Sequence, residues 1–350
     1  MDLSLFFAGT GGSVPSARRG LPAILVRRGG EKLLFDCGEG TQRQLVRSIG
    51  LLDVDSIFLT HFHADHWLGL PGMLKSFALR DRERPLTVYG PAGLEELMAA
   101  VRFIYGRLPY ELTISQLEPA ELVAREGYAI APIPVRHRGG GAFGYALVEE
   151  SRPGQFDPAL AAQLGVTPGP DFGRLQRGEA VGGVEPEQVM GPPRLGRKLV
   201  ISGDTAPSEA LVVAAHRADV LVHEATFTEE EADRARETEH STAKQAGATA
   251  LKAEVHMLAL THISARHAPR EIRAEAREVF PAAEIPRDFD TIEVPYPERG
   301  EPRLLPWRGR SGASEGSPAS GAGNGAEEGS QTSEDGESGL VATESGGTVS

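Results

Sequence analysis

Four side chains that can bind a metal lie within six positions of the sequence, in the stretch THFHADH. They are His61, His63, Asp65 and His66, and they follow the apolar run SIFLT (56–60), which predicts a strand. A loop at the end of a strand can direct all four side chains toward one point. Imidazole and carboxylate ligands together favour zinc and, less selectively, manganese or iron. A lone histidine is usually structural, whereas four such groups so close together indicate a metal site.

Three more candidate ligands lie at the ends of other predicted strands. His137 ends the run APIPVRH, Asp204 ends KLVISGD, and His262 lies late in HMLALTHI. Taken singly, each has an ordinary alternative, such as a capping aspartate or a surface histidine. Because all three share the same kind of position, they indicate further ligands, which two metal ions would need.

Runs of apolar residues predict the elements that position these side chains. Predicted strands cover 3–9, 23–28, 32–38, 56–60, 86–90, 128–137, 142–150, 198–204, 220–226 and 256–263. Predicted helices cover 69–81, 92–106, 208–218, 229–254 and 269–280. Strands follow one another early in the chain and alternate with helices later. Two mixed sheets packed face to face, with helices outside, accommodate that order.

Two segments interrupt this pattern. Residues 151–196 are rich in proline and glycine, have weak periodicity and include Arg174 and Arg177. An irregular segment of this length is typical of a functional or disordered region, and we interpret it as a binding arm. Residues 307–350 are mainly Gly, Ser and Glu, which predicts a disordered acidic tail beyond a folded domain over 1–306.

Charge and cysteine content limit the classes of function. The net charge is −13, and the seven acidic residues after 310 leave −6 for residues 1–310. Any nucleic-acid site must therefore be a local basic patch. Cys37 is the only cysteine, so neither an intrachain disulfide nor a cysteine-rich zinc site is possible. We find no secretory leader and no membrane span, and predict a soluble cytoplasmic protein.

The motifs together resemble a known family. THFHADH is similar to the HxHxDH signature of the metallo-β-lactamase superfamily. The segments AGTGGSVPSARRG, LLFDCGEGTQRQL, PVRHRGGGAFGYAL, ISGDTAPS, LVHEATF, HSTAKQA and LTHISARH resemble, in order, those of ribonuclease Z, the transfer-RNA 3′ processing endonuclease. This resemblance spans roughly residues 1–295. It implies an α/β fold, the metallo-β-lactamase-like αββα sandwich of two mixed sheets with outer helices, with residues 151–196 as an inserted flexible arm.

The resemblance also implies two Zn²⁺ ions per chain and a ligand set. His61, His63 and His137 would hold one zinc; Asp65, His66 and His262 would hold the other; and Asp204 would bridge them. Two neighbouring metal ions can stabilise both the attacking and the leaving oxygen of a phosphodiester.

Proton transfer is assigned by the same resemblance. His240, in HST, would lie near the scissile phosphate and protonate the leaving 3′-oxygen, oriented by Glu224 of HEAT. Asp65 would combine ligation with acceptance of a proton from the attacking water. A simpler alternative is that His240 only precedes and caps the helix that begins in STAKQA.

The implied substrate is precursor transfer RNA, cut by a homodimeric enzyme. The arm lies where the bacterial family places its transfer-RNA exosite, so Arg174 and Arg177 would contact RNA. Arg18 and Arg19, in a glycine-rich loop after the first strand, would contact phosphate. One alternative is a small-molecule ester or sulfate-ester hydrolase on the same dizinc scaffold. Another, a metal-bearing RNA-binding scaffold without catalysis, is disfavoured because every catalytic position is filled.

Overall fold

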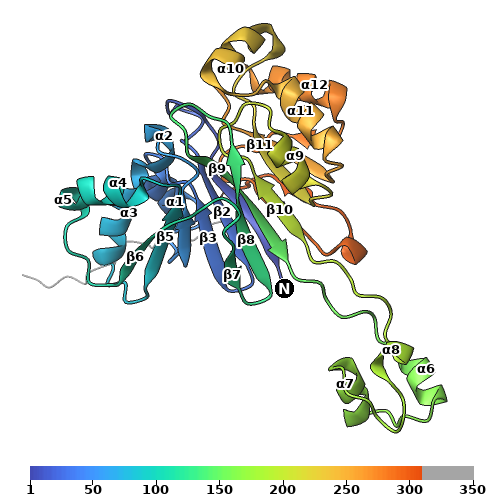
Figure 1. Ribbon diagram of the computed structural model, residues 1–350. Helices are drawn as coiled ribbons and strands as arrows, with labels where there is room; N and C mark the ends of the chain where they lie inside the picture. Colours follow the sequence, from blue (N-terminus) through green and yellow to red (C-terminus); the bar gives the residue numbers. More distant parts are fainter. Residues whose placement is uncertain (310–350) are drawn as a thin grey trace, which may run out of the picture. The chain divides into compact units, whose positions relative to one another are not determined.

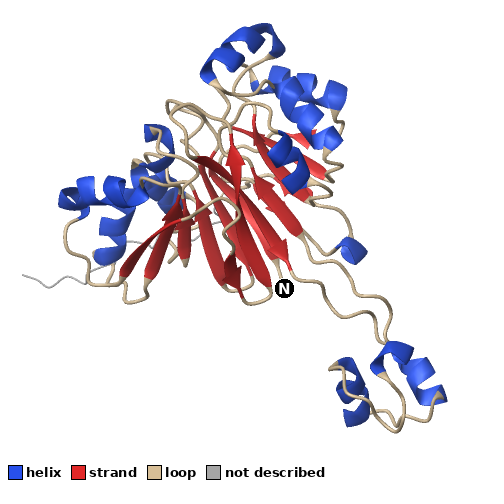
Figure 2. Ribbon diagram, viewed as in Figure 1, coloured by secondary structure: helices blue, strands red, loops and turns tan. Residues whose placement is uncertain are grey.

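The computed structural model describes residues 1–309, which form two mixed β-sheets with helices on their outer sides (Figures 1 and 2). The first sheet has the strand order β15 (Arg303–Leu305), β14 (Thr291–Glu293), β1 (Leu3–Gly9), β2 (Ala23–Arg28), β3 (Glu31–Phe35), β4 (Ser56–Phe58), β5 (Leu86–Gly90) and β6 (Leu112–Gln116). The second has the order β13 (Ala283–Glu284), β12 (Met257–Thr261), β11 (Val220–Glu224), β10 (Lys198–Ile201), β9 (Ala142–Glu149), β8 (Tyr128–Val135) and β7 (Val123–Arg125). The predicted αββα fold class is confirmed.

The two sheets face each other across a continuous apolar layer. Phe35 and Phe58 of the first sheet stack with ring centroids 5.1 Å apart, and Tyr145 of the second meets Phe58 edge-on at 5.4 Å. The Tyr145 hydroxyl donates a hydrogen bond to the Leu59 carbonyl (2.7 Å), so its polar end is satisfied within the core. This contact fixes the second sheet against the strand that leads into the histidine-rich loop.

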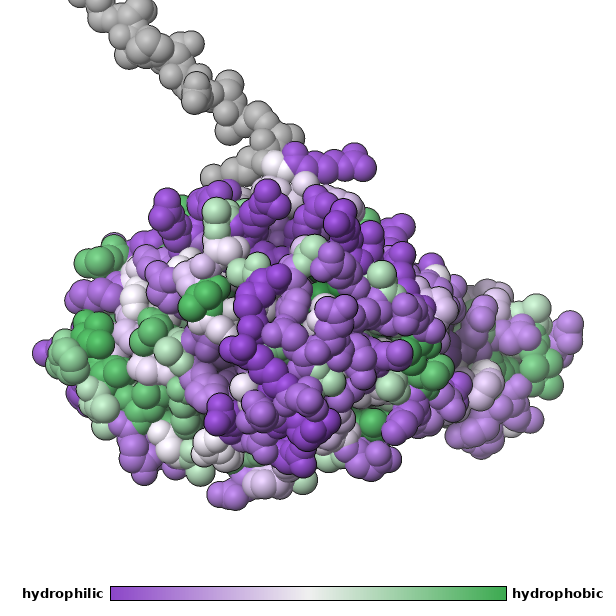
Figure 3. Space-filling model, turned by 90° about the horizontal axis from the view of Figure 1, so that it is seen from above, coloured by the Kyte–Doolittle hydropathy of each residue, from purple (hydrophilic) through white to green (hydrophobic). Residues whose placement is uncertain are grey.

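Helices cover the outer face of each sheet. The first sheet carries α1 (Thr41–Arg47), α2 (Ala64–Trp67), α3 (Gly69–Ala78), α4 (Leu94–Ala100) and α5 (Arg102–Tyr105). The second sheet carries α9 (Glu209–Ala215), α11 (Ala243–Lys252) and α12 (Pro269–Val279). The short helix α10 (Ala232–Thr238) contributes no residue to this core. Viewed from above, the molecule is mostly hydrophilic, with hydrophobic side chains gathered toward the α5 edge and on the arm (Figure 3).

The single helix predicted over 229–254 is wrong. A short 3-10 helix (Glu229–Glu231) leads into α10, which ends at Thr238, and α11 begins only at Ala243. Glu239 has φ +54°, a left-handed conformation that stops α10;. Thr242 then starts α11 with a capping box, in which its side chain accepts a hydrogen bond from the Gln245 N–H;. The break leaves His240 on a short connection between two helices.

Strands end earlier than predicted wherever a candidate site residue follows. β4 ends at Phe58, β10 at Ile201 and β12 at Thr261, whereas apolar runs predicted ends two or three residues later. His262 has φ +56°, so the chain turns away from the sheet at the candidate ligand itself. The last residues of these runs therefore form loops.

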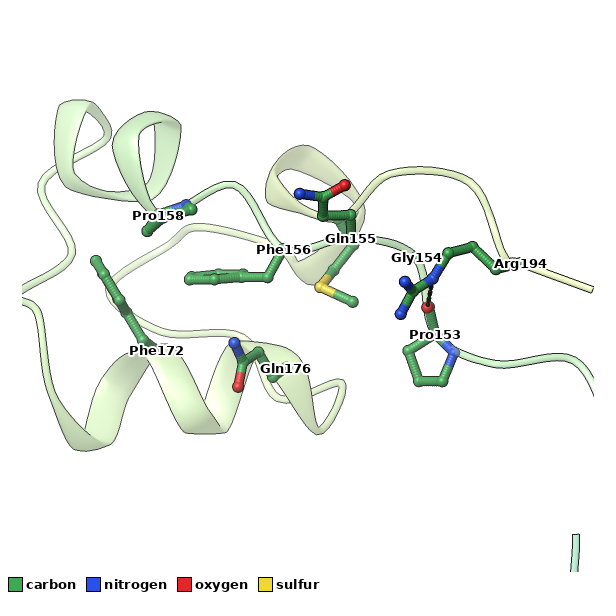
Figure 4. A pocket seen from close by; sticks show the side chains of 9 residues that line it. Pro153, Gly154, Gln155, Phe156, Pro158, Phe172, Gln176 and Arg194 are labelled. Carbon is green, nitrogen blue, oxygen red and sulfur yellow. Dashed lines mark hydrogen bonds between the residues drawn. The ribbon is translucent and has the colours of Figure 1, made fainter. Parts of the chain in front are cut away.

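The arm leaves the second sheet after β9 and returns to it at β10 (Figure 1). At its base, the outgoing and returning segments of the chain are joined by an isolated antiparallel bridge between Arg152 and Arg194. The arm contains α6 (Pro158–Gln163), α7 (Pro170–Gln176) and α8 (Pro186–Val189), which surround a small apolar core. A pocket of about 600 Å³ lies beside this core, where the rings of Phe156 and Phe172 meet edge to face (Figure 4). The arm is therefore a small folded unit rather than an irregular loop.

The described chain ends close to the first sheet. Trp307, the first residue assigned to the tail, packs edge-on against Phe289, and its backbone N–H donates to the Asp290 carboxylate (2.8 Å). The tail prediction from residue 310 onward lies outside the described residues. Within residues 1–309, no helix is both long and apolar enough to cross a bilayer.

Candidate metal centre

The candidate ligands lie beyond the carboxyl ends of four strands. β4 leads into the His61–His66 segment, β8 into His137, β10 into Asp204 and β12 into His262. Strands β10, β11 and β12 are parallel neighbours, so their carboxyl ends share one edge of the sheet;. Residues as far apart as 65 and 262 thereby come within hydrogen-bonding distance. All seven predicted ligands meet at this edge.

The first loop is held by close backbone packing. His63 is the N-cap residue of α2, and Asp65 and His66 lie in that helix. At the start of α3, Gly69 lies so close to Gly38 that an added Cβ would be 2.1 Å from the Gly38 carbonyl oxygen. Glycine is required here by the close approach of two backbones.

The Asp204 carboxylate lies at the middle of the cluster. Its Oδ2 is 3.2 Å from His262 Nε2, 3.3 Å from His66 Nε2, and 3.9 Å from both His61 Nε2 and His137 Nε2. Two triads flank it, each with ligand atoms within 4.8 Å of one another: His61, His63 and His137, and Asp65, His66 and His262. One carboxylate between two triads is the arrangement that two bridged metal ions require.

Four of the five histidines are oriented by a partner on Nδ1. His61 Nδ1 faces Thr60 Oγ1 at 3.0 Å, and His262 Nδ1 faces Thr226 Oγ1 at 2.8 Å. His66 Nδ1 pairs with an Asp36 oxygen at 2.8 Å, and His137 Nδ1 faces the Glu239 carbonyl at 3.0 Å. Each Nδ1–H donates outward, which leaves Nε2 with its lone pair toward the centre.

Two observations test whether a cation fits. His61 Nε2 and His66 Nε2 are buried and have no hydrogen-bond partner among the described residues. In addition, His262 Nε2 faces the carboxylate oxygens of Asp65 and Asp204 at 3.2 Å. Acceptor atoms turned toward one another in a buried site are costly unless a cation lies between them. The donor set therefore fits metal ions, and its nitrogen and oxygen atoms suit zinc.

Burial and charge keep His61 and Asp204 in ligating states. Burial lowers the pKa of His61 well below its usual value, so the imidazole is neutral;. Burial opposes the charge of Asp204, but His262 and His66 outweigh it and hold the pKa of that carboxyl well below its usual range. Neutral imidazole and ionised carboxylate are the forms that bind a metal.

His240 forms a pair with Glu224 beside the cluster. His240 Nδ1 is 2.8 Å from Glu224 Oε1, and Glu224 is fully buried at the end of β11. Burial opposes charge on His240, but Glu224 and then Asp204 raise the pKa of His240 to about 9. The N–H groups of Thr205 and Thr226 also donate to the Glu224 carboxylate. His240 thus holds a proton 3.8 Å from the central Asp204 carboxylate. It precedes Thr242, the actual N-cap of α11, so helix capping does not account for it.

Sequence reasoning missed the residues that orient the ligands. Asp36, which follows β3 with φ +57°, accepts from both the N–H and the hydroxyl of Thr60 as well as from His66. Thr226 links Glu224 to His262. Asp36 offered one signal, since it is an acid directly after a buried strand, like the ligand Asp204. The threonines offered none.

The four arginines expected at RNA occupy different environments. Arg18 is exposed. Arg19 is half-buried, donates to the Thr10 hydroxyl and to the Pro286 carbonyl (3.0 Å), and burial lowers its pKa. Arg174 and Arg177 lie on the arm, where both form ion pairs with Glu179.

Comparison with known proteins identifies similar chains. Residues 19–253 match the model of the metallo-beta-lactamase superfamily. The chain is 43% identical to ribonuclease Z of Methanosarcina acetivorans over 302 residues, covering 84% of this chain and 99% of that protein. It is 45% identical to ribonuclease Z of Myxococcus xanthus, over 84% and 98%. The crystal structure of the short form of human tRNase Z superposes with a TM-score of 0.62 at 27% identity, over 83% and 99%.

Proposed function

The chain belongs to the ribonuclease Z family of the metallo-β-lactamase superfamily, and from this we propose that it removes the 3′ trailer from precursor transfer RNA. It would hydrolyse one phosphodiester and leave a 3′-hydroxyl on the transfer RNA. The observation that carries the proposal is the His240–Glu224 pair at 2.8 Å beside seven convergent ligands. A leaving 3′-oxygen needs a proton, and this pair can supply one.

We propose two Zn²⁺ ions per chain. His61, His63 and His137 would hold one ion, Asp65, His66 and His262 the other, with Asp204 shared. When bound, the pair of ions would activate water and stabilise charge on the phosphodiester. The central position of Asp204 and the outward Nδ1 contacts of four histidines support this division.

The chain's own residues would handle the protons. Glu224 fixes the His240 ring through Nδ1 and stabilises its protonated form, so the ring can give a proton to the departing oxygen;. Asp65 would accept the proton of the attacking water. Its carboxylate is ionised: burial opposes its charge, but the neighbouring His262 and His66 outweigh burial and lower its pKa. The Ser13 N–H holds one Asp65 oxygen at 2.7 Å.

The arm supplies a second support for an RNA substrate. A folded unit on a two-stranded stalk can contact a large substrate at a distance from the site of cleavage, whereas a small ester would never reach it. Arg18, Arg19, Arg174 and Arg177 remain the proposed RNA contacts. Arg174 and Arg177 would exchange their ion pairs with Glu179 for contacts to RNA, so they would add little net charge attraction. We further propose a cytoplasmic homodimer. Its support is the family resemblance and a single buried cysteine that needs no oxidising compartment;.

A comparison of substrates tests this proposal against an ester or sulfate-ester hydrolase. We expect the purified chain to hydrolyse bis(p-nitrophenyl) phosphate and to be much slower on a lactone or an aryl sulfate of similar size. Two neighbouring metal ions suit the attacking and leaving oxygens of a phosphodiester, and bis(p-nitrophenyl) phosphate is the only one of the three substrates that carries this group. Faster turnover of the lactone or the sulfate would favour the small-molecule alternative.

A further inference from the structure

A second concave surface lies beside the metal centre, and arginines dominate its walls. This cleft, of about 1090 Å³, is bounded by residues 15–20, one side of α1 with the two residues before it, the start of α12 and residues 285–289. Its lining includes Arg18, Arg19, Arg43, Arg47, Arg270, Arg273 and Arg287. The acidic residues in the lining are Glu39 and Asp288. Seven positive charges against two form a strong local exception in a chain of net charge −13.

Most of these arginines are available to a ligand. Arg19 and Asp288 lie deeper than the others and are tied to the protein, where both contact Thr10. The other six arginines are exposed. Within residues 1–309, the guanidinium groups of Arg18, Arg43 and Arg287 form no ion pair and no hydrogen bond; Arg18 and Arg287 donate only from their backbone N–H groups. A group of unpaired guanidinium groups around one cleft favours an anionic ligand with several charges.

The cleft is connected to the metal centre by one segment of chain. The Ser13 N–H donates to the ligand Asp65, and the Gly12 backbone packs so closely on His262 that a Cβ would be 2.4 Å from its ring. A few residues later, 15–20 form a wall of the cleft. The Gly11 N–H donates to the Gly20 carbonyl (2.8 Å), which closes this segment into a loop. A strand of RNA cut at the metal centre would pass directly into the cleft on the Asp65 and His262 side.

The shape of the cleft suits a single strand. Phe289 contributes a partly exposed ring to the lining, with the Arg47 guanidinium 5.8 Å from its centroid. Proteins bind single-stranded nucleic acid partly through positive charge that follows the backbone. The Phe289 ring already stacks on Phe6 and meets Trp307 edge-on, so the cleft offers charge rather than a stacking surface. An A-form duplex keeps its phosphates on the outside of a wide helix and could not enter a space of this volume.

We propose that this arginine cleft binds the phosphates of the single-stranded 3′ trailer of the precursor. The inference rests on the proposed function and adds the site at which the released trailer would be bound. The precursor extends in two directions from the cut, and the arm, on the second sheet, serves the transfer-RNA body. The cleft lies away from the arm, between segments beside the first sheet and the start of α12, and the loop that contacts Asp65 leads to it, so it remains for the strand that departs.

Trailer length provides the first test. A double variant, Arg43→Gln with Arg287→Gln, removes two exposed charges that hold nothing in the fold. On a precursor with a trailer of about ten nucleotides, we expect kcat/KM to fall about tenfold at low salt and the salt dependence to weaken by about 1.4 in log–log slope. On a precursor with a single-nucleotide trailer, we expect almost no change. The control, Arg102→Gln with Arg107→Gln, removes two exposed charges near α5 and should change neither substrate. An equal loss on long and short trailers would place the cleft on the transfer-RNA body and overturn the proposal.

Direct binding provides a test that needs no cleavage. Fluorescence anisotropy with a labelled single-stranded oligoribonucleotide of about ten nucleotides should give about tenfold weaker binding for the double variant than for the wild type and the control. Equal binding by all three proteins would contradict the cleft assignment. Failure of the wild type to cut any precursor, with the binding difference intact, would instead contradict the proposed function and leave an RNA-binding cleft.

Discussion

At the scale of single residues, the metal centre depends on each histidine presenting one nitrogen. His63 differs from the others because its Nδ1, not its Nε2, faces His137 Nε2 at 3.0 Å. It is also the most exposed of the cluster histidines, so its replacement should leave the fold intact.

We therefore expect His63→Ala to lose metal and phosphodiesterase activity together while its melting temperature stays close to that of the wild type in chelator. Elemental analysis of the purified variant, with His216→Ala as a control outside the cluster, measures the effect. The wild type should carry close to two divalent metal ions, such as zinc, per chain. A metal-free variant with full activity would refute the ligand assignment.

The role of His240 separates two kinds of leaving group. We expect His240→Ala to bind precursor transfer RNA almost normally but to cut it about 10²–10⁴ times more slowly, the usual effect of losing one proton-transfer group. An activated aryl leaving group needs little protonation, so bis(p-nitrophenyl) phosphate should be affected less. Steady-state kinetics on both substrates test this, and an equal loss on both would indicate a structural role for His240.

The sequence was most informative about residues with unusual chemistry. Seven potential ligands were visible because His and Asp recur just after apolar runs, and the structure brings all seven together. Asp36, Thr60 and Thr226 were not predicted, because their role depends on hydrogen bonds across the fold, such as the contact between residues 36 and 66. The sequence also could not show that Arg18 is exposed and Arg19 half-buried, so both were predicted to contact phosphate.

At the scale of elements, the base of the arm is held by a buried ionic cluster. Glu149, the last residue of β9, accepts hydrogen bonds from Arg28 and, through both carboxylate oxygens, from Arg197, all near 2.8 Å. Arg197 and Arg152 both pack on the Tyr296 ring, 4.0 and 3.6 Å from its centroid. The two ends of the arm are thereby joined to each other and to the C-terminal segment.

We expect Glu149→Gln to lower the free energy of unfolding by about 3 kcal/mol at neutral pH, because it leaves two buried guanidinium groups without their counter-charge. Burial opposes the charge of Glu149, but Arg197 and Arg28 outweigh it and lower its pKa. The stabilisation is therefore complete above the ordinary glutamate pKa of about 4.3 and is lost as the pH falls below it. Urea unfolding from neutral to acidic pH measures this. The exposed neighbour provides a control, Glu150→Gln, and a difference from wild type that did not shrink in acid would contradict the assignment.

The arm itself should contribute binding energy that depends little on salt. Residues 151–196 contain four arginines and five acidic residues, and Arg174 and Arg177 are already paired with Glu179. We expect replacement of residues 153–193 by a short Gly–Ser linker to raise KM for precursor transfer RNA, to spare hydrolysis of bis(p-nitrophenyl) phosphate, and to leave the salt slope nearly unchanged. Damage to both substrates would show that the arm is structural.

Element boundaries marked the limit of sequence reasoning. Ten predicted strands correspond to strands in the structure, because apolar periodicity reports burial directly. Five strands were missed. β7, β13, β14 and β15 contain two or three residues each, and β6, LTISQ, is only partly buried and has no apolar run. The predicted helix over 229–254 ignored the left-handed Glu239, whose conformation no periodicity reveals.

At the scale of the whole molecule, one region carries positive charge although the net charge of the chain is negative. The chain is acidic overall, yet one cleft next to the metal centre carries seven arginines. An acidic surface weakens non-specific binding of nucleic acid. The basic cleft still attracts the RNA backbone next to the metal centre, where the strand would lie during cleavage. Sequence order could not reveal this cleft, because its arginines come from four separate segments of the chain.

The central claim is tested most directly by the position of the cut. The zinc-loaded protein, incubated with a 3′-extended precursor transfer RNA, should release the trailer in one piece and leave a mature-length transfer RNA with a 3′-hydroxyl, mapped by sequencing of both product ends. Both products should disappear with a chelator and return when zinc is restored. Stepwise shortening of the trailer alone, a 3′-phosphate on the transfer RNA, or full cleavage in the presence of the chelator would contradict the account.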